Sequence, residues 1–180
     1  LKLVDEKLCS AIEIGIPFSD PIAEGKTIQR SSSVALKNGV TIDSTLKTIS
    51  EINKYNKDTP IISMGYYNPI IKIGLDNFFS GCKQSGVNGV IIADIPNTEL
   101  EIIQNTANKY QIETIPLVPL NASDTTVEHA CKIGQGFIYC VSVLGVTGTR
   151  EKLSKDLSKK VNQVNNFSEI PVAVGFGISR

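Results

Sequence analysis

The chain has 180 residues, with 18 basic and 18 acidic side chains and 41% hydrophobic residues. This length is enough for one domain with a hydrophobic core. The zero net charge argues against a dedicated nucleic-acid or membrane-surface binder, because both need a basic excess. No apolar run is long enough to cross a membrane, and the first residues, LKLVDEKL, contain no signal-peptide core.

Short apolar runs alternate with longer amphipathic runs along the chain. This order is typical of successive βα units in a parallel sheet. The short runs predict strands at residues 11–16, 60–65, 89–93, 114–118, 136–142 and 171–174. The amphipathic runs predict helices at 44–57, 75–86, 98–110, 125–134 and 153–165. No linker or low-complexity segment interrupts them, so residues 1–180 are predicted to form a single domain.

A closed (β/α)8 barrel is favoured over an open sheet for this α/β pattern. Several predicted strands end in small, polar or aromatic residues before a loop, as at YYNP (66–69) and DIP (94–96). Neither the GxGxxG nor the GxxxxGK[ST] nucleotide-binding fingerprint is present. A complete barrel has eight strands in about 250 residues. We therefore expect an incomplete barrel, truncated at both ends, with about strands 2–7 present.

The segment EIGIPFSDPIAEG (13–25) contains two candidate catalytic carboxylates. In the predicted strand, Glu13 shares one face with Ala11 and Gly15, which leave space around it. A charge is costly in a strand that is apolar on both sides, so we expect Glu13 to have a function and a pKa raised toward neutrality. The competing interpretation is a structural ion pair. Glu24 lies near the end of the loop that follows the strand.

Other candidate residues follow the predicted strands, and in a barrel the active site lies at the C-terminal ends of the strands. They are Tyr66, Asp94, Tyr139 and the glycine-bearing turns at 145–148 and 175–177. Backbone amides of such turns can bind phosphate, so the set predicts acid–base chemistry on a phosphorylated small molecule. Packing for the tyrosines and helix capping for Asp94 are the alternative interpretations.

Metal and Schiff-base mechanisms have little support in the sequence. The predicted strands contain no lysine, and no cluster of histidines and carboxylates is present. His129 lies in a predicted helix, where we expect a surface or structural residue rather than a catalyst. The cysteines have no metal-type or redox-type spacing and are interpreted as free thiols in a reducing compartment: Cys9, Cys82, Cys131 and Cys140.

Five segments resemble the tryptophan synthase alpha subunit in order and spacing. They are EIGIPFSDPIAEGKTIQ (13–29), MGYYNPI (64–70), IIADIP (91–96), GVTGTR (145–150) and GFGIS (175–179). The resemblance covers nearly the whole chain. It implies a (β/α)8-barrel lyase of tryptophan biosynthesis. Such an enzyme cleaves indole-3-glycerol phosphate to indole and glyceraldehyde 3-phosphate by a retro-aldol reaction, without a metal or a Schiff base.

The resemblance also implies roles for individual residues. Glu13 matches the catalytic glutamate that moves protons between the indole C3 and the glycerol hydroxyl. Glu24 stands where the family has an aspartate that holds the indole N–H, and Thr147 lies on a loop expected to close over the substrate. The remaining substrate-binding positions are Met64, Tyr66, Ile91, Ala93, Leu117, Tyr139 and Phe176. Gly148 and Gly177 match phosphate-binding backbone positions.

The family's partner is a beta subunit, which receives indole through a tunnel in an α2β2 heterotetramer. Pyridoxal phosphate is expected only in that beta subunit, so the resemblance implies no cofactor in this chain. The segments that would face the partner contain Pro17, Asp20, Asn68 and Pro96. We expect a soluble protein in the cytoplasm, or in the plastid stroma of a plant or alga.

Two residues depart from the family pattern. Glu24 is one methylene longer than the usual aspartate, which would displace its carboxylate by about an ångström in a site that depends on position. Lys26 stands where proline is usual, which loosens the end of the loop. Glu24 and the truncation keep open a non-catalytic alpha-like subunit that activates a beta partner. A stand-alone indole-glycerol-phosphate lyase stays open as well.

Overall fold

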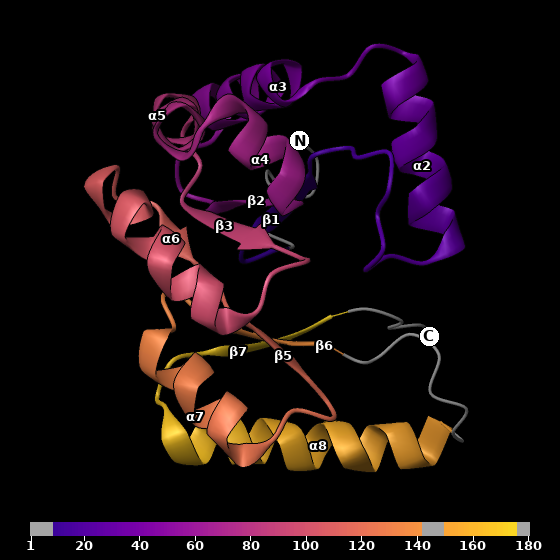
Figure 1. The fold of residues 1–180 in the computed structure, drawn as a ribbon, viewed down its shortest axis with the longest axis vertical. Helices are drawn as coiled ribbons and strands as arrows, with labels where there is room; N and C mark the ends of the chain where they lie inside the picture. Colours follow the sequence, from indigo (N-terminus) through magenta and orange to yellow (C-terminus); the bar gives the residue numbers. More distant parts are fainter. Residues whose placement is uncertain (1–8, 142–149, 176–180) are drawn as a thin grey trace. The chain divides into compact units, whose positions relative to one another are not determined.

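The computed structural model describes residues 9–141 and 150–175, which form two compact units. Unit 1 contains Leu1–Ile95 and Ile102–Glu113, and unit 2 contains Pro96–Glu101 and Thr114–Arg180. Each unit is a parallel sheet with helices packed on it (Figure 1). In the described part of the chain, no helix is both long and apolar enough to span a membrane. The single domain stays a prediction.

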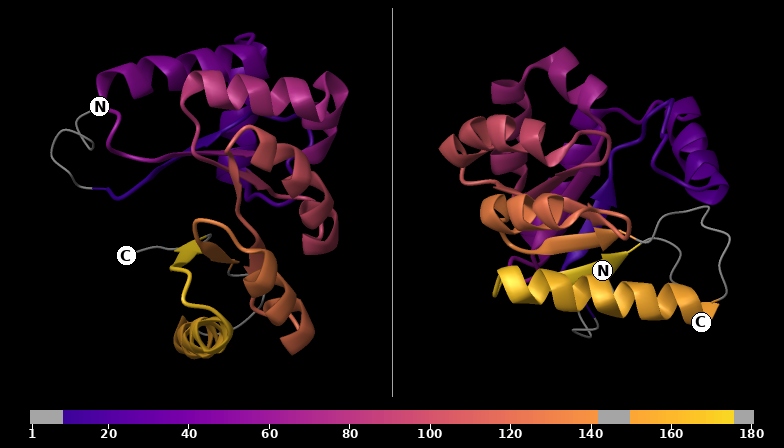
Figure 2. Two further views of the ribbon diagram at one scale, coloured as in Figure 1. Left: turned by 90° about the vertical axis from the view of Figure 1, so that its left-hand side faces the viewer. Right: turned by 60° about the horizontal axis from the view of Figure 1, so that its bottom comes forward.

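Unit 1 contains a parallel sheet and most of the helices. Strands β1 (Ile12–Gly15), β2 (Ile61–Gly65) and β3 (Gly89–Ile92) pair in that order, and the short β4 (Glu113–Thr114), of which only Glu113 belongs to unit 1, follows β3. The helices are α2 (Lys26–Lys37), α3 (Ile42–Tyr55), α4 (Tyr67–Ile73), α5 (Leu75–Ser85) and the part of α6 (Asn97–Lys109) from Ile102 onward. Figures 1 and 2 show α3 and α5 side by side over one face of the sheet.

The core of unit 1 lies between the sheet and these helices. Ile61 of β2 and Val90 of β3 are buried in one cluster with Phe78 and Phe79 of α5. Burying an aromatic or aliphatic side chain of this size contributes about 1.5–3 kcal/mol. Because successive side chains of a strand point to opposite faces, the residues next to these core positions lie on the other face of the sheet. That face carries the candidate catalytic strand residue.

Unit 2 contains a second parallel sheet of β5 (Leu117–Pro119), β6 (Ile138–Val141) and β7 (Val172–Gly175). Helices α7 (Asp124–Ile133) and α8 (Arg150–Phe167) pack together on one face of it (Figure 2). The cluster between them is fully buried and includes Val118, Val127, Ile138, Cys140 and Val164.

Most predicted elements are confirmed, but three are corrected. The run at 114–118 is not one strand: it contributes to β4 and β5, which belong to different sheets. Pro116 lies between them and has no N–H to donate to a strand ladder, which explains the interruption. The sequence also gave no prediction of α2 or α4. Helix α2 has no buried residue, and its polar run (KTIQRSSS) obscures the helical spacing of its few apolar residues.

Candidate active site

Strand β1 places Glu13 on the face of the unit 1 sheet that is turned away from the helices. Its register partner on β2 is Ile62. The Glu13 side chain is exposed, so the apolar burial expected for it is wrong. Ala11 is exposed as well, and a Cβ added at Gly15 would meet nothing within 4 Å. The small neighbours leave space as predicted, but the space makes Glu13 accessible instead of burying it.

Glu24 is the carboxylate that is removed from water. The residue is half-buried, and its Oε2 atom is buried with no hydrogen-bond partner among the described residues. Burial raises the pKa of the Glu24 carboxyl, and the negative charge of Glu13 raises it further. The two candidate carboxylates therefore interact electrostatically. Glu24 therefore has a raised pKa, and the raised pKa expected for Glu13 stays a prediction.

Glu24 lines a cavity of about 240 Å³ in unit 1. Pockets that enclose a drug-sized ligand measure about 300–1,000 Å³, so this cavity suits one group rather than a whole substrate. The lining comes from the end of β1, the loop that follows it, α2 and the segment after it, and the residue that follows β2. Its residues are Gly15, Ile16, Pro17, Pro21, Glu24, Ile28, Ser31, Ser32, Ala35, Val40 and Tyr66.

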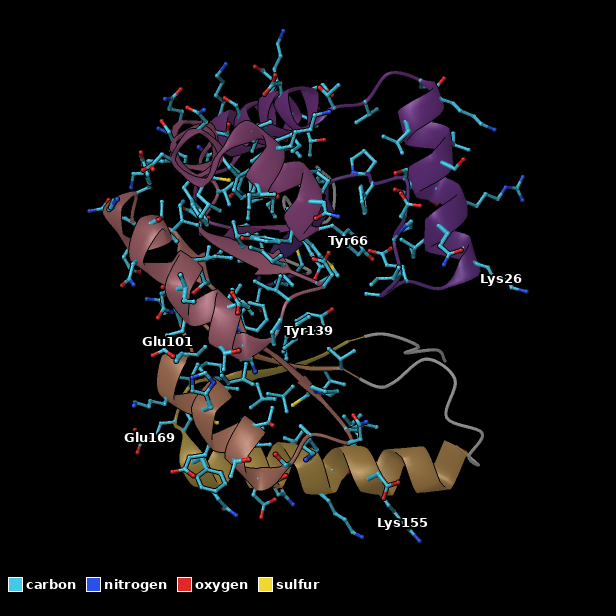
Figure 3. The ribbon with its side chains drawn as sticks, in the orientation of Figure 1. Lys26, Tyr66, Glu101, Tyr139, Lys155 and Glu169 are labelled. Atoms are coloured by element: carbon cyan, nitrogen blue, oxygen red, sulfur yellow. The ribbon has the colours of Figure 1, made fainter. Side chains whose placement is uncertain are left out.

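Tyr66 follows β2 and reaches the loop that carries Glu24 (Figure 3). Its phenol oxygen accepts a hydrogen bond from the Ala23 N–H at 3.2 Å. Burial raises the pKa of Tyr66 to about 12, and the charge of Glu24 contributes to the increase. The phenol is therefore neutral at physiological pH.

Asp94 follows β3 and caps a helix, although not the helix that the sequence suggested. Its Oδ1 accepts a hydrogen bond from the Tyr67 N–H at 2.8 Å, at the start of α4. Capping of the next helix along the chain was only an alternative interpretation, and the helix that Asp94 caps is α4. A carboxylate at a helix start satisfies a backbone N–H that has no partner within the helix. Asp94 thus fixes the point where the chain leaves β2 and Tyr66.

In each unit, the described residues predicted to bind substrate lie side by side on neighbouring strands. In unit 1, Met64 pairs in register with Ile91, both buried, and the half-buried Ala93 donates its N–H to the Gly65 carbonyl at 2.9 Å. In unit 2, Leu117 and Tyr139 are register partners. Four predicted site residues lie outside the described residues: Thr147, Gly148, Phe176 and Gly177.

Tyr139 in unit 2 also explains one glycine of the GFGIS motif. A Cβ added at Gly175 would overlap with the Tyr139 phenol ring. Gly175 is therefore needed for close approach of the ring to the β7 backbone. A glycine within a strand often marks such a close approach.

The residues predicted to face a partner are distributed over both units. Pro17 and Asn68 line the same cavity of about 540 Å³ in unit 1, together with Phe18 and Pro69. Asp20 is exposed in the loop after β1. Pro96 is exposed in unit 2, where its carbonyl accepts hydrogen bonds at the start of α6.

Ser32 is a site residue that the sequence analysis missed. It lies in the serine run of α2 and lines the cavity beside Glu24. Ile28, Ser32 and Ala35 are spaced as i, i+4 and i+7, and all three line the cavity. This spacing is the signal that could have identified Ser32, but the exposed polar residues of α2 obscure it.

Comparison with known proteins gives the family. The family model described as "Tryptophan synthase alpha chain" matches residues 1–180. The chain belongs to the tryptophan synthase alpha-chain family. The alpha chain of Geobacillus stearothermophilus is 39% identical over 176 residues, covering 98% of this chain and 65% of that protein. The tryptophan synthase of Saccharomyces cerevisiae is 42% identical over 169 residues, covering 93% of this chain and 24% of that protein.

Solved structures of this family share the fold. A structure of the tryptophan synthase α2β2 complex from Pyrococcus furiosus matches with a TM-score of 0.90 and 37% identity, over 99% of this chain and 72% of that one. The alpha subunit from Legionella pneumophila matches with a TM-score of 0.86 and 31% identity, over 98% and 65%. The predicted fold class, α/β of the (β/α)8-barrel type, is confirmed. The chain spans about 65% of the length of the Geobacillus alpha chain.

The described residues also limit where a metal could bind. Within residues 9–141 and 155–175, no group of three or more His, Cys, Asp or Glu side chains is arranged to hold a metal ion. The single histidine, His129, places Nε2 3.0 Å from the Glu101 carboxylate in unit 2. This contact fits the structural role expected for His129.

Proposed function

We propose that this protein is the alpha subunit of tryptophan synthase and cleaves indole-3-glycerol phosphate to indole and glyceraldehyde 3-phosphate. One observation carries the proposal. In a chain of this family, an accessible carboxylate at Glu13 raises the pKa of a second, partly buried carboxylate at Glu24. Two interacting carboxylates with different surroundings suit two different roles in acid–base chemistry.

Glu13 is the proposed proton-transfer group. A proton is added at the indole C3, and a proton is removed from the hydroxyl on the adjacent glycerol carbon. The bond between that carbon and C3 then breaks, its electron pair returns to the indole ring, and the hydroxyl carbon becomes the aldehyde of glyceraldehyde 3-phosphate. The exposure of Glu13 and the open space at Gly15 leave room for a substrate at this carboxylate.

Glu24 is the proposed electrostatic group. When C3 is protonated, positive charge develops at the indole nitrogen, and a carboxylate that accepts the N–H bond stabilises it. The unpartnered Oε2 of Glu24 supports this role, because a buried acceptor without a donor is costly unless a ligand supplies one. The remaining pocket is proposed to consist of Met64, Tyr66, Ile91, Ala93, Leu117, Tyr139, Thr147 and Phe176, with Gly148 and Gly177 binding phosphate.

The partner is proposed to be a beta subunit in an α2β2 assembly, facing Pro17, Asp20, Asn68 and Pro96. The α2β2 complex of the related Pyrococcus furiosus protein supports this proposal. Pyridoxal phosphate would belong to the beta subunit, and this chain would need no cofactor. The four cysteines without a disulfide fit a soluble protein of a reducing compartment, either the cytoplasm or a plastid stroma.

One observation favours a second candidate, a non-catalytic alpha-like subunit that activates a beta partner. Glu24 replaces the family's aspartate and is one methylene longer. The two candidates differ in the effect of Glu24→Asp. An enzyme limited by this methylene would gain indole-releasing activity in the variant, whereas a non-catalytic subunit would show none before or after the change.

The test is a product assay on the protein expressed from its complete reading frame. Indole-3-glycerol phosphate is supplied with and without a beta subunit, and indole and glyceraldehyde 3-phosphate are measured. The proposal predicts equal amounts of both products and a faster reaction with the beta subunit. No product from either preparation, together with intact stimulation of the beta subunit, would support the non-catalytic candidate instead.

A further inference from the structure

The loop of residues 17–25, called here the Glu24 loop, is attached to its surroundings at three points. Tyr66 contacts it from the end of β2, and Ser32 and Gln29 contact it from α2. Two of these three side chains, Tyr66 and Ser32, also line the cavity that Glu24 lines. The same residues therefore hold the loop and surround its carboxylate.

Ser32 holds the beginning of the Glu24 loop. Its Oγ accepts a hydrogen bond from the Phe18 N–H at 2.9 Å and donates one to the Phe18 carbonyl at 3.0 Å. One hydroxyl thus satisfies both backbone groups of a residue fourteen positions away. A loop residue that is paired on both sides has little freedom to rotate.

Tyr66 holds the end of the loop. Its phenol oxygen accepts the Ala23 N–H at 3.2 Å, one residue before Glu24. Its ring also packs against the Phe18 ring, with the ring centres 5.2 Å apart. Gln29 adds a third attachment, because its Nε2 donates to the Glu24 carbonyl at 2.9 Å. The backbone on each side of the Glu24 carboxylate is thereby fixed.

We propose that Tyr66 and Ser32 are positioning residues that orient the Glu24 carboxylate through its backbone. This inference rests on the proposed function, because it assigns Glu24 a role in the reaction. It differs from the substrate contact proposed above for Tyr66, since the phenol here acts through the Ala23 amide. A displacement of about 1 Å in a reacting group can cost up to a hundredfold in rate, so such support matters.

The first test needs no activity. Amide hydrogen exchange at Ala23 is compared in the wild-type protein and Tyr66→Phe, with Tyr67→Phe as the matched control one residue away. Loss of the phenol oxygen should increase Ala23 exchange about fivefold, the factor that corresponds to a hydrogen bond of about 1 kcal/mol. Tyr67→Phe should leave it unchanged. Equal Ala23 exchange in all three proteins overturns the proposal.

Ser32 is tested in the same way at Phe18. Ser32→Ala should increase Phe18 amide exchange, whereas Ser33→Ala, on the exposed side of α2, should not. Ser32→Thr keeps the hydroxyl and should restore the protection. Failure of Ser32→Thr to restore it, in a variant with a wild-type circular dichroism spectrum, counts against the role of Ser32.

The second test is a double-mutant cycle on indole release. Tyr66→Phe should lower kcat about tenfold with KM almost unchanged, and should have almost no further effect when Glu24→Gln is already present. A rise in KM alone, or the same loss of kcat in both backgrounds, would mean that Tyr66 contacts the substrate directly. If the wild-type protein releases no indole, the proposed function fails, while the exchange measurements still decide whether Tyr66 and Ser32 hold the loop.

Discussion

The negative charge of Glu13 raises the pKa of Glu24, after the larger effect of burial. The two residues are eleven positions apart, one on β1 and the other near the start of α2. Their interaction gives the site an accessible carboxylate and a partly desolvated one. The proposed mechanism uses this difference directly, because proton transfer needs access to substrate and charge stabilisation benefits from a lower dielectric.

Glu24 should make the stability of the protein depend on pH. The folded state raises the pKa of Glu24 above the ordinary value of 4.5 and so binds this proton more tightly than the unfolded chain does. The resulting stabilisation is complete below pH 4.5 and is lost as the pH rises through the folded pKa. Urea midpoints of the wild-type protein should therefore fall relative to those of Glu24→Gln between pH 4 and about pH 8.

The control for this comparison is Glu99→Gln, which changes an exposed glutamate on α6. It makes the same chemical change at a site outside the cavity. A difference between the wild-type protein and Glu24→Gln that stays constant over the pH range would contradict the raised pKa of Glu24.

The four cysteines should differ strongly in reactivity. Burial raises the pKa of Cys82 to about 12 and of Cys140 to about 11, and it raises the pKa of Cys131 as well. Thiolates are the reactive form, so only the half-buried Cys9 should react quickly with a disulfide reagent at pH 8. All four should react in denaturant. Cys9→Ser should remove the fast phase, and a second fast thiol in the native protein would show that a buried site opens.

Two strand-end glycines should respond differently to alanine. Gly175→Ala places a Cβ against the Tyr139 ring and should destabilise the protein by about 1–3 kcal/mol, the usual cost of overpacking. Gly15→Ala meets nothing within 4 Å and should change the stability by less than about 0.5 kcal/mol. Urea unfolding measures both. In a Tyr139→Ala background the cost of Gly175→Ala should disappear, and its persistence would show that the strain lies elsewhere.

The sequence predicted the parts of the molecule that depend on local pattern. Apolar runs such as the one around Val90 identify buried strands, and helical spacing identifies α3 and α5 because each has a buried face. Helix α2 was missed because its polar residues obscure the spacing of its few apolar ones. The break at Pro116 was missed because one proline in a short apolar run does not reveal which sheet each half joins.

The identity of the site residues was predictable, but their surroundings were not. The motif around Glu13 and Glu24 indicated two carboxylates, and alternation placed Ala11, Glu13 and Gly15 on one face. Burial of Glu24 depends on Tyr66, which lies 42 positions later, and on the cavity-lining side of α2. Contacts at that range are set by tertiary packing, so the sequence did not indicate that Glu24 is partly desolvated.

The most direct test of the proposed mechanism is the indole-release rate of Glu13→Gln, measured with the beta subunit present. Glutamine keeps the shape of Glu13 but cannot exchange a proton, so kcat should fall by about 10²–10⁴, the usual contribution of a general acid–base. Exchange protection in the Glu24 loop should stay at the wild-type level, which separates lost chemistry from lost structure. Wild-type activity in Glu13→Gln would contradict the assignment of Glu13 as the proton-transfer group.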